Sequence, residues 1–172
     1  MNDELSHTRA LKVAAYLLRI GLAASFLSAV ADRLGYWGPH STRGVLWGDL
    51  KHFNAYVHRL DPLLPPEVTP YMSEAIICIE ILLALCLLTG WALRWASLGS
   101  TILLSTYAVG MVFAFGPKTP LDCSILTSAA SAFLLYTLQL RGAEKNNIEP
   151  TPRKSLFSDI HIRPTKVPGQ TK

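Results

Sequence analysis

The sequence predicts an all-α integral membrane protein, a four-helix bundle with a short amphipathic helix in its outer loop. Half of the 172 residues are hydrophobic and only 16% are charged, against about 25% in ordinary soluble domains. Four segments are apolar enough to cross a hydrocarbon core of about 30 Å as helices, and they make one transmembrane domain. The domain covers residues 11–141, and its expected spans are residues 11–31, 71–89, 95–116 and 121–140.

The first expected span contains Arg19 as its only charge between Val13 and Ala31. A second interpretation is open, because basic residues precede an apolar run that closes on small residues, a pattern typical of a signal peptide. Cleavage of such a peptide would leave three spanning helices in the chain.

The second and third expected spans carry little charge. Residues 71–89 contain Glu74 and Glu80, and Gly90 can end this helix. Residues 95–116 carry no charged side chain at all. A helix of a soluble bundle would keep a polar face, so this segment favours a membrane span over a soluble core helix.

The fourth expected span, residues 121–140, contains Asp122 as its only charge and is followed by Arg141. Residues 142–172 are polar, basic and rich in proline, and they show no apolar periodicity. A segment of this composition buries too little apolar surface to fold, which predicts a disordered cytoplasmic tail.

The outer loop, residues 32–70, contains a helical pattern. Its apolar side chains recur at three- and four-residue steps, and charged residues lie off this stripe. The spacing predicts a short helix that lies on the outer membrane surface or caps the bundle. The residues of the stripe are Trp47, Leu50, Phe53, Val57 and Leu60.

The distribution of Lys and Arg predicts the orientation. Basic residues lie near the N-terminal segment 1–10, in the turn between the second and third spans, and after the fourth span. With four spans these segments share one side, so we expect both termini in the cytoplasm and the chain in the inner (plasma) membrane. The outer loop also carries arginines, which makes the bias moderate.

Ionisable residues within a membrane are costly and therefore indicate candidate functional sites. Arg19 and Glu80 lie near the middle of two successive spans that run in opposite directions. The sequence therefore predicts an intramembrane Arg19–Glu80 ion pair at one depth. Two roles are open for this pair, structural fixing of two helices and a relay for protons or substrate.

A second candidate site is an outward-facing polar pocket near the outer ends of the spans. The alternative is a set of ordinary charged side chains that extend from helix ends toward water. The residues of this expected pocket are Ser28, Asp32, Arg33, Glu74, Lys118, Asp122 and Ser124.

Other classes of function have less support. The basic excess is not clustered with a nucleic-acid recognition motif, so we expect no nucleic-acid partner. No CxxC and no cysteine–histidine cluster with zinc spacing occurs, so we expect no metal site. No motif of a known soluble enzyme is present, and whether the chain catalyses a reaction stays open.

Three motifs stand in order along residues 11–140. An arginine opens a run rich in small residues (RIGLAASFLSAVADRLGYWGP, from Arg19), and a glutamate marks the second span (EILLALCLLTG, from Glu80). A Pro-Leu-Asp turn precedes the fourth span (KTPLDCSIL, from Lys118). Together they resemble the DoxX family of small four-helix bacterial membrane proteins, although Cys123 stands where relatives have an aromatic residue. The resemblance favours a retained first span over a signal peptide.

This resemblance implies a membrane component of a redox-linked process. The family is named after a membrane subunit associated with quinol and thiosulfate oxidation, and some members are implicated in oxidative or thiol stress. Quinone is then a candidate cofactor, and a membrane or periplasmic oxidoreductase is a candidate partner besides the lipid bilayer. A homo-oligomer is also open. The alternatives are a small permease or ion-conducting protein, with Arg19, Glu80 and Asp122 lining a path, and a non-catalytic membrane scaffold.

Overall fold

The computed structural model of the chain describes residues 2–148. All regular secondary structure in this part is helical, which confirms the expected all-α class. The expected disordered tail was residues 142–172. Its first part, residues 142–148, belongs to helix α6, and the remainder lies outside the described residues. The helices are α1 (Asn2–Arg33), α2 (Leu50–Leu60), α3 (Thr69–Thr89), α4 (Leu93–Phe115), α5 (Lys118–Asp122) and α6 (Ile125–Ile148).

Three of these helices are long and apolar enough to cross a membrane, namely α1 from Arg9 to Arg33 and the whole of α3 and α4. Helix α6 is not among them. It carries hydroxyl side chains in its first half, and Gln139 and Arg141 lie in its second half. The first three expected spans are therefore confirmed in length and composition, whereas the fourth span and the four-helix membrane bundle are not confirmed.

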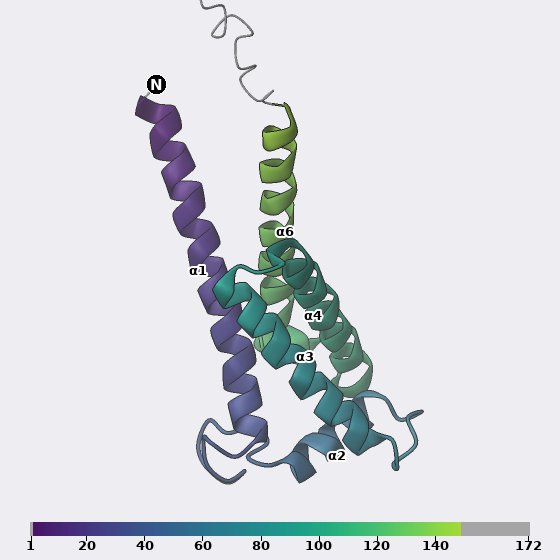
Figure 1. Ribbon diagram of the computed structural model, residues 1–172. Coiled ribbons are helices and arrows are strands. Elements are labelled where there is room, and N and C mark those ends of the chain that lie inside the picture. Colours follow the sequence, from purple (N-terminus) through teal and green to yellow (C-terminus); the bar gives the residue numbers. More distant parts are fainter. Residues whose placement is uncertain (1, 149–172) are drawn as a thin grey trace, which may run out of the picture.

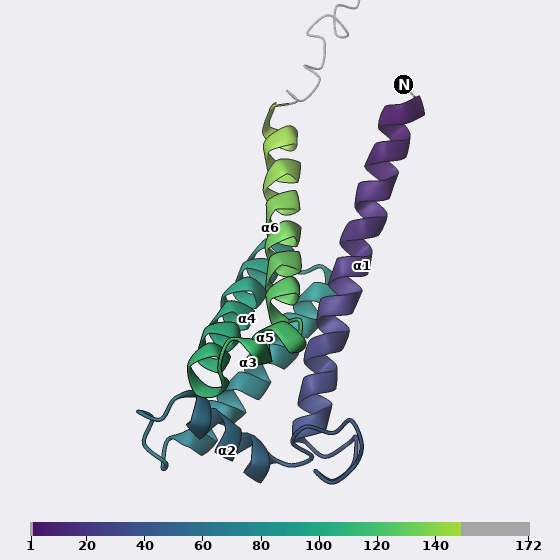
Figure 2. The ribbon, with the colours of Figure 1, turned by 180° about the vertical axis from the view of Figure 1, so that it is seen from behind.

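The helices run alternately up and down (Figure 1). Helix α1 packs mainly against α3, and α4 packs mainly against α6. Helix α2 and the loops around it lie at one end of the molecule, which we call the α2 end (Figure 1). At the opposite, terminal end, α1 begins and α6 ends, and both project beyond α3 and α4 (Figures 1 and 2). Figure 2 also shows α5 as the short turn that leads from α4 into α6.

Small residues fill the contacts between the long helices. Ala23, Ala84 and Ala132 are completely buried, and small side chains let helix backbones approach closely. Ser97 and Ser100 are also buried, and each hydroxyl donates a hydrogen bond to the carbonyl four residues earlier in α4. These serines therefore pack as small residues without leaving their hydroxyl groups unsatisfied.

Helix α2 confirms the amphipathic pattern of the outer loop, with Phe53 and Val57 buried on its inner face. Asp49 caps its first turn by accepting a hydrogen bond from the backbone N–H of His52 at 2.8 Å. This bond holds the pKa of the Asp49 carboxyl below its usual range. The helix packs across α3 and α4, so the central residues of the stripe, Phe53 and Val57, face the protein, whereas Leu50 is exposed.

Candidate functional site

Glu80 lies in the middle of α3 and is only 1% exposed. Its Oε1 accepts a hydrogen bond of 2.8 Å from the hydroxyl of Tyr107 on α4. Its Oε2 accepts a hydrogen bond from Nη1 of Arg33, the last residue of α1. The Arg33–Glu80–Tyr107 cluster therefore joins three helices around one buried carboxylate.

Arg19 is not the partner of Glu80, contrary to the ion pair expected from the sequence. Its Nε donates to the carbonyl of Leu87 at 2.8 Å, and its Nη2 donates to the carbonyl of Leu88 at 3.1 Å. The last carbonyls of a helix lack intrahelical partners, so Arg19 caps the C-terminal end of α3. Gly90 ends this helix at φ 80°, as expected, and a Cβ there would lie 2.8 Å from the Arg19 guanidinium.

The depth of the helices explains this difference. Helix α1 has 32 residues and α3 has 21, and α1 extends far beyond α3 at the terminal end (Figure 1). Arg19 is central in its expected span but lies level with the last turn of α3. Arg33 then reaches Glu80, because its long side chain extends from the end of α1 into the bundle instead of toward water.

Two aromatic rings also contact the Arg33 guanidinium. Its guanidinium carbon lies 4.0 Å from the centroid of the Phe53 ring and 4.9 Å from that of Trp47. Both distances are typical of cation–π contacts, which gain strength when the cation is desolvated. Arg33 is only 3% exposed. The start of α2 and the loop before it therefore form a lid over the ion pair.

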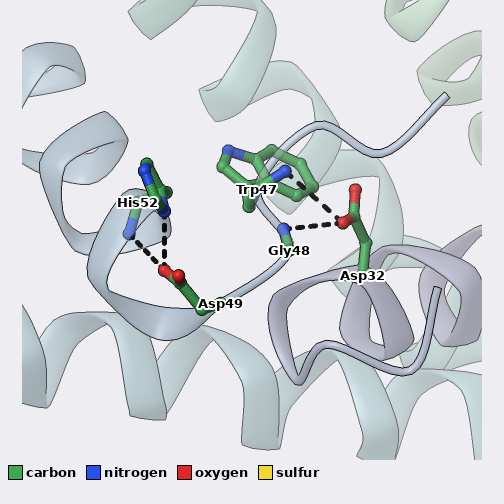
Figure 3. Close-up of polar contacts among 5 residues, drawn as sticks. All are labelled: Asp32, Trp47, Gly48, Asp49 and His52. Atoms are coloured by element: carbon green, nitrogen blue, oxygen red, sulfur yellow. Dashed lines mark hydrogen bonds and ion pairs between the residues drawn. The ribbon is translucent and has the colours of Figure 1, made fainter. Parts of the chain in front are cut away.

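Asp32 fastens this lid to the end of α1. Its carboxylate accepts a backbone N–H hydrogen bond from Leu46 at 2.9 Å. It also accepts backbone N–H hydrogen bonds from Trp47 at 3.4 Å and Gly48 at 3.0 Å (Figure 3). Gly48 adopts φ 70°, and a Cβ at this position would lie 2.3 Å from the backbone nitrogen of His40. The loop therefore needs glycine here to approach the Asp32 carboxylate.

The structure does not gather the residues of the expected outward-facing pocket in one place. Asp32 and Arg33 are buried, and they bind the lid loop and Glu80, respectively. Lys118 and Asp122 pair with each other within α5, and both are exposed. The three remaining residues, Ser28, Glu74 and Ser124, also lie exposed on the surface.

Four polar side-chain atoms are buried without a hydrogen-bond partner in the described part of the chain, and all belong to residues near the α2 end. Ser73 is completely buried on α3, two helical turns before Glu80 on the same face. Unpaired buried polar atoms are costly, so this end of the bundle is suited to hold water or a small polar ligand. The atoms are Arg33 Nε, Asn54 Oδ1, His58 Nδ1 and Ser73 Oγ.

Sequence reasoning did not identify Tyr107, Phe53 or Trp47 as parts of this site. A signal existed for Tyr107, because it is the only tyrosine in a span that carries no charge. The contacts of Phe53 and Trp47 with Arg33 gave no local signal in the sequence, because they depend on how the outer loop packs against the end of α1. Within residues 2–148, no group of histidine, cysteine and carboxylate side chains is arranged to hold a metal ion.

A comparison with known families identifies this architecture. The family model of the methylamine utilisation protein MauE matches residues 11–132, well over half of the chain. The chain belongs to the MauE family. Together with three helices that can cross a membrane, this makes it a multi-pass membrane protein. No curated protein and no solved structure matches the chain.

The MauE match corrects the resemblance to the DoxX family. The arginine of the first span, the glutamate of the second and the Pro-Leu-Asp turn suggested that resemblance. In the structure, Arg19 caps the end of α3 and the Pro-Leu-Asp segment forms the short α5, and such local features are too common to separate one family from another. The region matched by the MauE model includes the first span and all of Arg33, Glu80 and Tyr107.

Proposed function

We propose that this MauE-family chain is the membrane component of a methylamine utilisation system, and that it acts through the Arg33–Glu80–Tyr107 cluster. The observation that carries the proposal is the burial of Glu80, 1% exposed, in a helix that can span a membrane. Intramembrane carboxylates are expensive and usually mark functional sites. Stability alone is a weak explanation, because apolar residues of similar volume often stabilise a fold as well as a buried ion pair does.

The cluster is suited to holding and moving a proton. Glu80 accepts hydrogen bonds from a cation and from a phenol, so its carboxylate is the natural proton-accepting group of the site. Tyr107 donates the hydrogen bond of its neutral hydroxyl group to this carboxylate. The lid of aromatic rings keeps bulk water away, which strengthens every electrostatic interaction inside.

We further propose that the methylamine utilisation system to which the chain belongs carries out a redox-linked process. Oxidation of methylamine to formaldehyde and ammonia takes its oxygen atom from water, and it releases two protons together with two electrons that pass to an acceptor. A membrane component that handles protons beside an electron carrier fits this chemistry. Quinone as that carrier, and an oxidoreductase as partner, are part of the same proposal.

The Arg33–Glu80–Tyr107 cluster supports a proton-handling role rather than a role as a permease for methylammonium. Methylammonium is a cation at neutral pH and would need an available carboxylate. Glu80 already pairs with Arg33, whose positive charge would repel such a substrate. A scaffold role has one supporting observation, the fastening of the lid loop by Asp32, which gives the α2 end a fixed surface.

We also propose that α6 is a fourth span and that both termini are cytoplasmic. Helix α6 packs along α4, and it ends at the same end of the molecule at which α1 begins (Figure 1). Arg9, Arg94 and Arg141 belong to this end. The outer loop at the α2 end also carries Arg43, Lys51 and Arg59, so the bias is moderate. The positive-inside rule counts cations close to the spans, and Arg9, Arg94 and Arg141 support a cytoplasmic terminal end.

Growth tests this function in a host whose use of methylamine as nitrogen source depends on the chain. Glu80→Gln and Tyr107→Phe keep the size of each side chain, and we expect both to abolish or strongly slow growth on methylamine. The control is Glu74→Gln, since Glu74 is exposed on the same helix. It should grow like the wild type.

Membrane abundance, measured by immunoblotting, separates loss of function from loss of folding. Variants that accumulate normally but do not support growth would confirm an active cluster. If Glu80→Gln and Tyr107→Phe both accumulate and support normal growth, the cluster is structural and the scaffold role replaces the proposal.

A further inference from the structure

A groove opens at the α2 end, and Trp47 is one of its lining residues. Its volume is about 340 Å³. Tyr56 stacks on Phe115 with ring centroids 5.4 Å apart, and Trp47 meets Tyr56 edge-on at 5.6 Å. These rings make the groove predominantly apolar. The full lining is His40, Leu46, Trp47, His52, Ala55, Tyr56, Arg59, Phe115 and Thr119.

The polar groups of the groove favour an anion. Arg59 holds its guanidinium over the Phe115 ring, 4.8 Å from the centroid. No carboxylate of residues 2–148 forms an ion pair with it. His40 and His52 stack at 4.3 Å on the rim, and the nearby carboxylate of Asp49 is already engaged by His52. The groove therefore offers a positively charged donor at its edge.

The position of the groove identifies the molecule that would fill it. Phe115 is the last residue of α4, where a helix able to span the membrane ends. This is the depth at which the apolar core of a bilayer meets the headgroups. A molecule with an apolar body and an anionic group, present at this depth, is a phospholipid.

We propose that the groove is a binding site for an anionic phospholipid, with the phosphate at Arg59 and an acyl chain against Tyr56 and Phe115. The bound lipid also supports the lid, because Trp47 both lines the groove and contacts Arg33. The site does not depend on the role of Glu80 in methylamine utilisation.

Native mass spectrometry of the full chain in a nonionic detergent tests the site. The protein is titrated separately with phosphatidylglycerol and with phosphatidylcholine of the same acyl chains. We expect about a fivefold preference for phosphatidylglycerol, the factor that one cation contributes at an anionic membrane surface. Arg59→Gln should abolish this preference and Arg59→Lys should retain most of it.

Arg43→Gln is the matched control, because Arg43 is an exposed cation of the same loop region outside the groove. It should leave the preference unchanged. Equal binding of the two lipids by the wild type would overturn the proposal, as would an equal loss in the Arg43 and Arg59 variants. Displacement of phosphatidylglycerol by an equal concentration of inorganic phosphate would also overturn it, in favour of a site for a free anion.

Discussion

Arg33 forms an ion pair with Glu80 beneath the lid at the α2 end, although Arg33 is the last residue of α1 and Glu80 lies in the middle of α3. The pair is nearly free of solvent, with side-chain exposures of 4% and 1%. Its energetics follow from this burial. Two charges that leave water together lose hydration, and only a close, fully hydrogen-bonded contact offsets that cost.

A double-mutant cycle on this pair should therefore show strong coupling. Arg33→Met leaves an uncompensated carboxylate in an apolar site, and we expect a loss of about 3–5 kcal/mol in the free energy of unfolding. Adding Glu80→Leu to Arg33→Met should restore most of that stability. Reversible unfolding in detergent micelles compares Arg33→Met, Glu80→Leu and the double variant with the wild type.

Arg19 supplies the control for this cycle. Because Arg19 bonds to carbonyls at the end of α3, the effects of Arg19→Met and Glu80→Leu should add, within about 0.5 kcal/mol. Strong coupling between Arg19 and Glu80, with none between Arg33 and Glu80, would show that the pairing described for α1 and α3 is incorrect.

The junction after α3 gives a second prediction. Gly90 has φ 80°, and an added Cβ would lie 2.8 Å from Nη2 of Arg19. Gly90→Ala should therefore strain the backbone and displace the Arg19 cap, at a cost of about 1–3 kcal/mol in the free energy of unfolding. The same unfolding measurement applies.

Gly21→Ala is the matched change, since Gly21 lies in α1 and has no neighbouring atom within 4 Å of the added methyl group. Alanine has the higher helix propensity, so this variant should be neutral or stabilised by up to about 1 kcal/mol. Equal destabilisation of the two variants would mean that the left-handed turn at Gly90 and its contact with Arg19 are unimportant.

Local patterns in the sequence predicted the elements well. The apolar stripe of the outer loop fixed α2, and the expected spans 71–89 and 95–116 lie within two residues of α3 and α4. Helix α6 starts later than expected, because Ser124 takes a φ of 54° and separates it from the short α5. Periodicity and hydropathy act over neighbouring residues, so they predict where helices form better than where each helix begins and ends.

The pairing of charges was beyond such local patterns. Whether Arg19 or Arg33 meets Glu80 depends on how far α1 slides past α3 and on where a long side chain points. Neither property is encoded in the spacing of residues within one helix. The lid could not be predicted from local patterns either, because the contacts of Trp47 and Phe53 with Arg33 require the whole outer loop to pack against the bundle.

The alkaline titration of Tyr56 gives the third prediction. Burial, followed by the nearby Cys123 thiolate, raises the pKa of Tyr56 from 10.0 to about 12. The folded protein thus favours the neutral phenol. This contribution to stability is fully present below a pH of about 10 and is lost as the pH rises toward 12. Tyrosine ring labelling and NMR follow this titration, and Tyr56→Phe assigns the signal.

Cys123→Ser separates the two causes. It removes the thiolate charge but leaves the ring in place, so the pKa of Tyr56 should fall part of the way and stay above the usual value, because burial is the larger cause. A Tyr56 signal that titrates near 10 in the wild-type protein would show that the ring is not enclosed by Trp47 and Phe115. The packing of Tyr56 against Trp47 and Phe115 would then be incorrect, and this result would not depend on the Arg33–Glu80 pair.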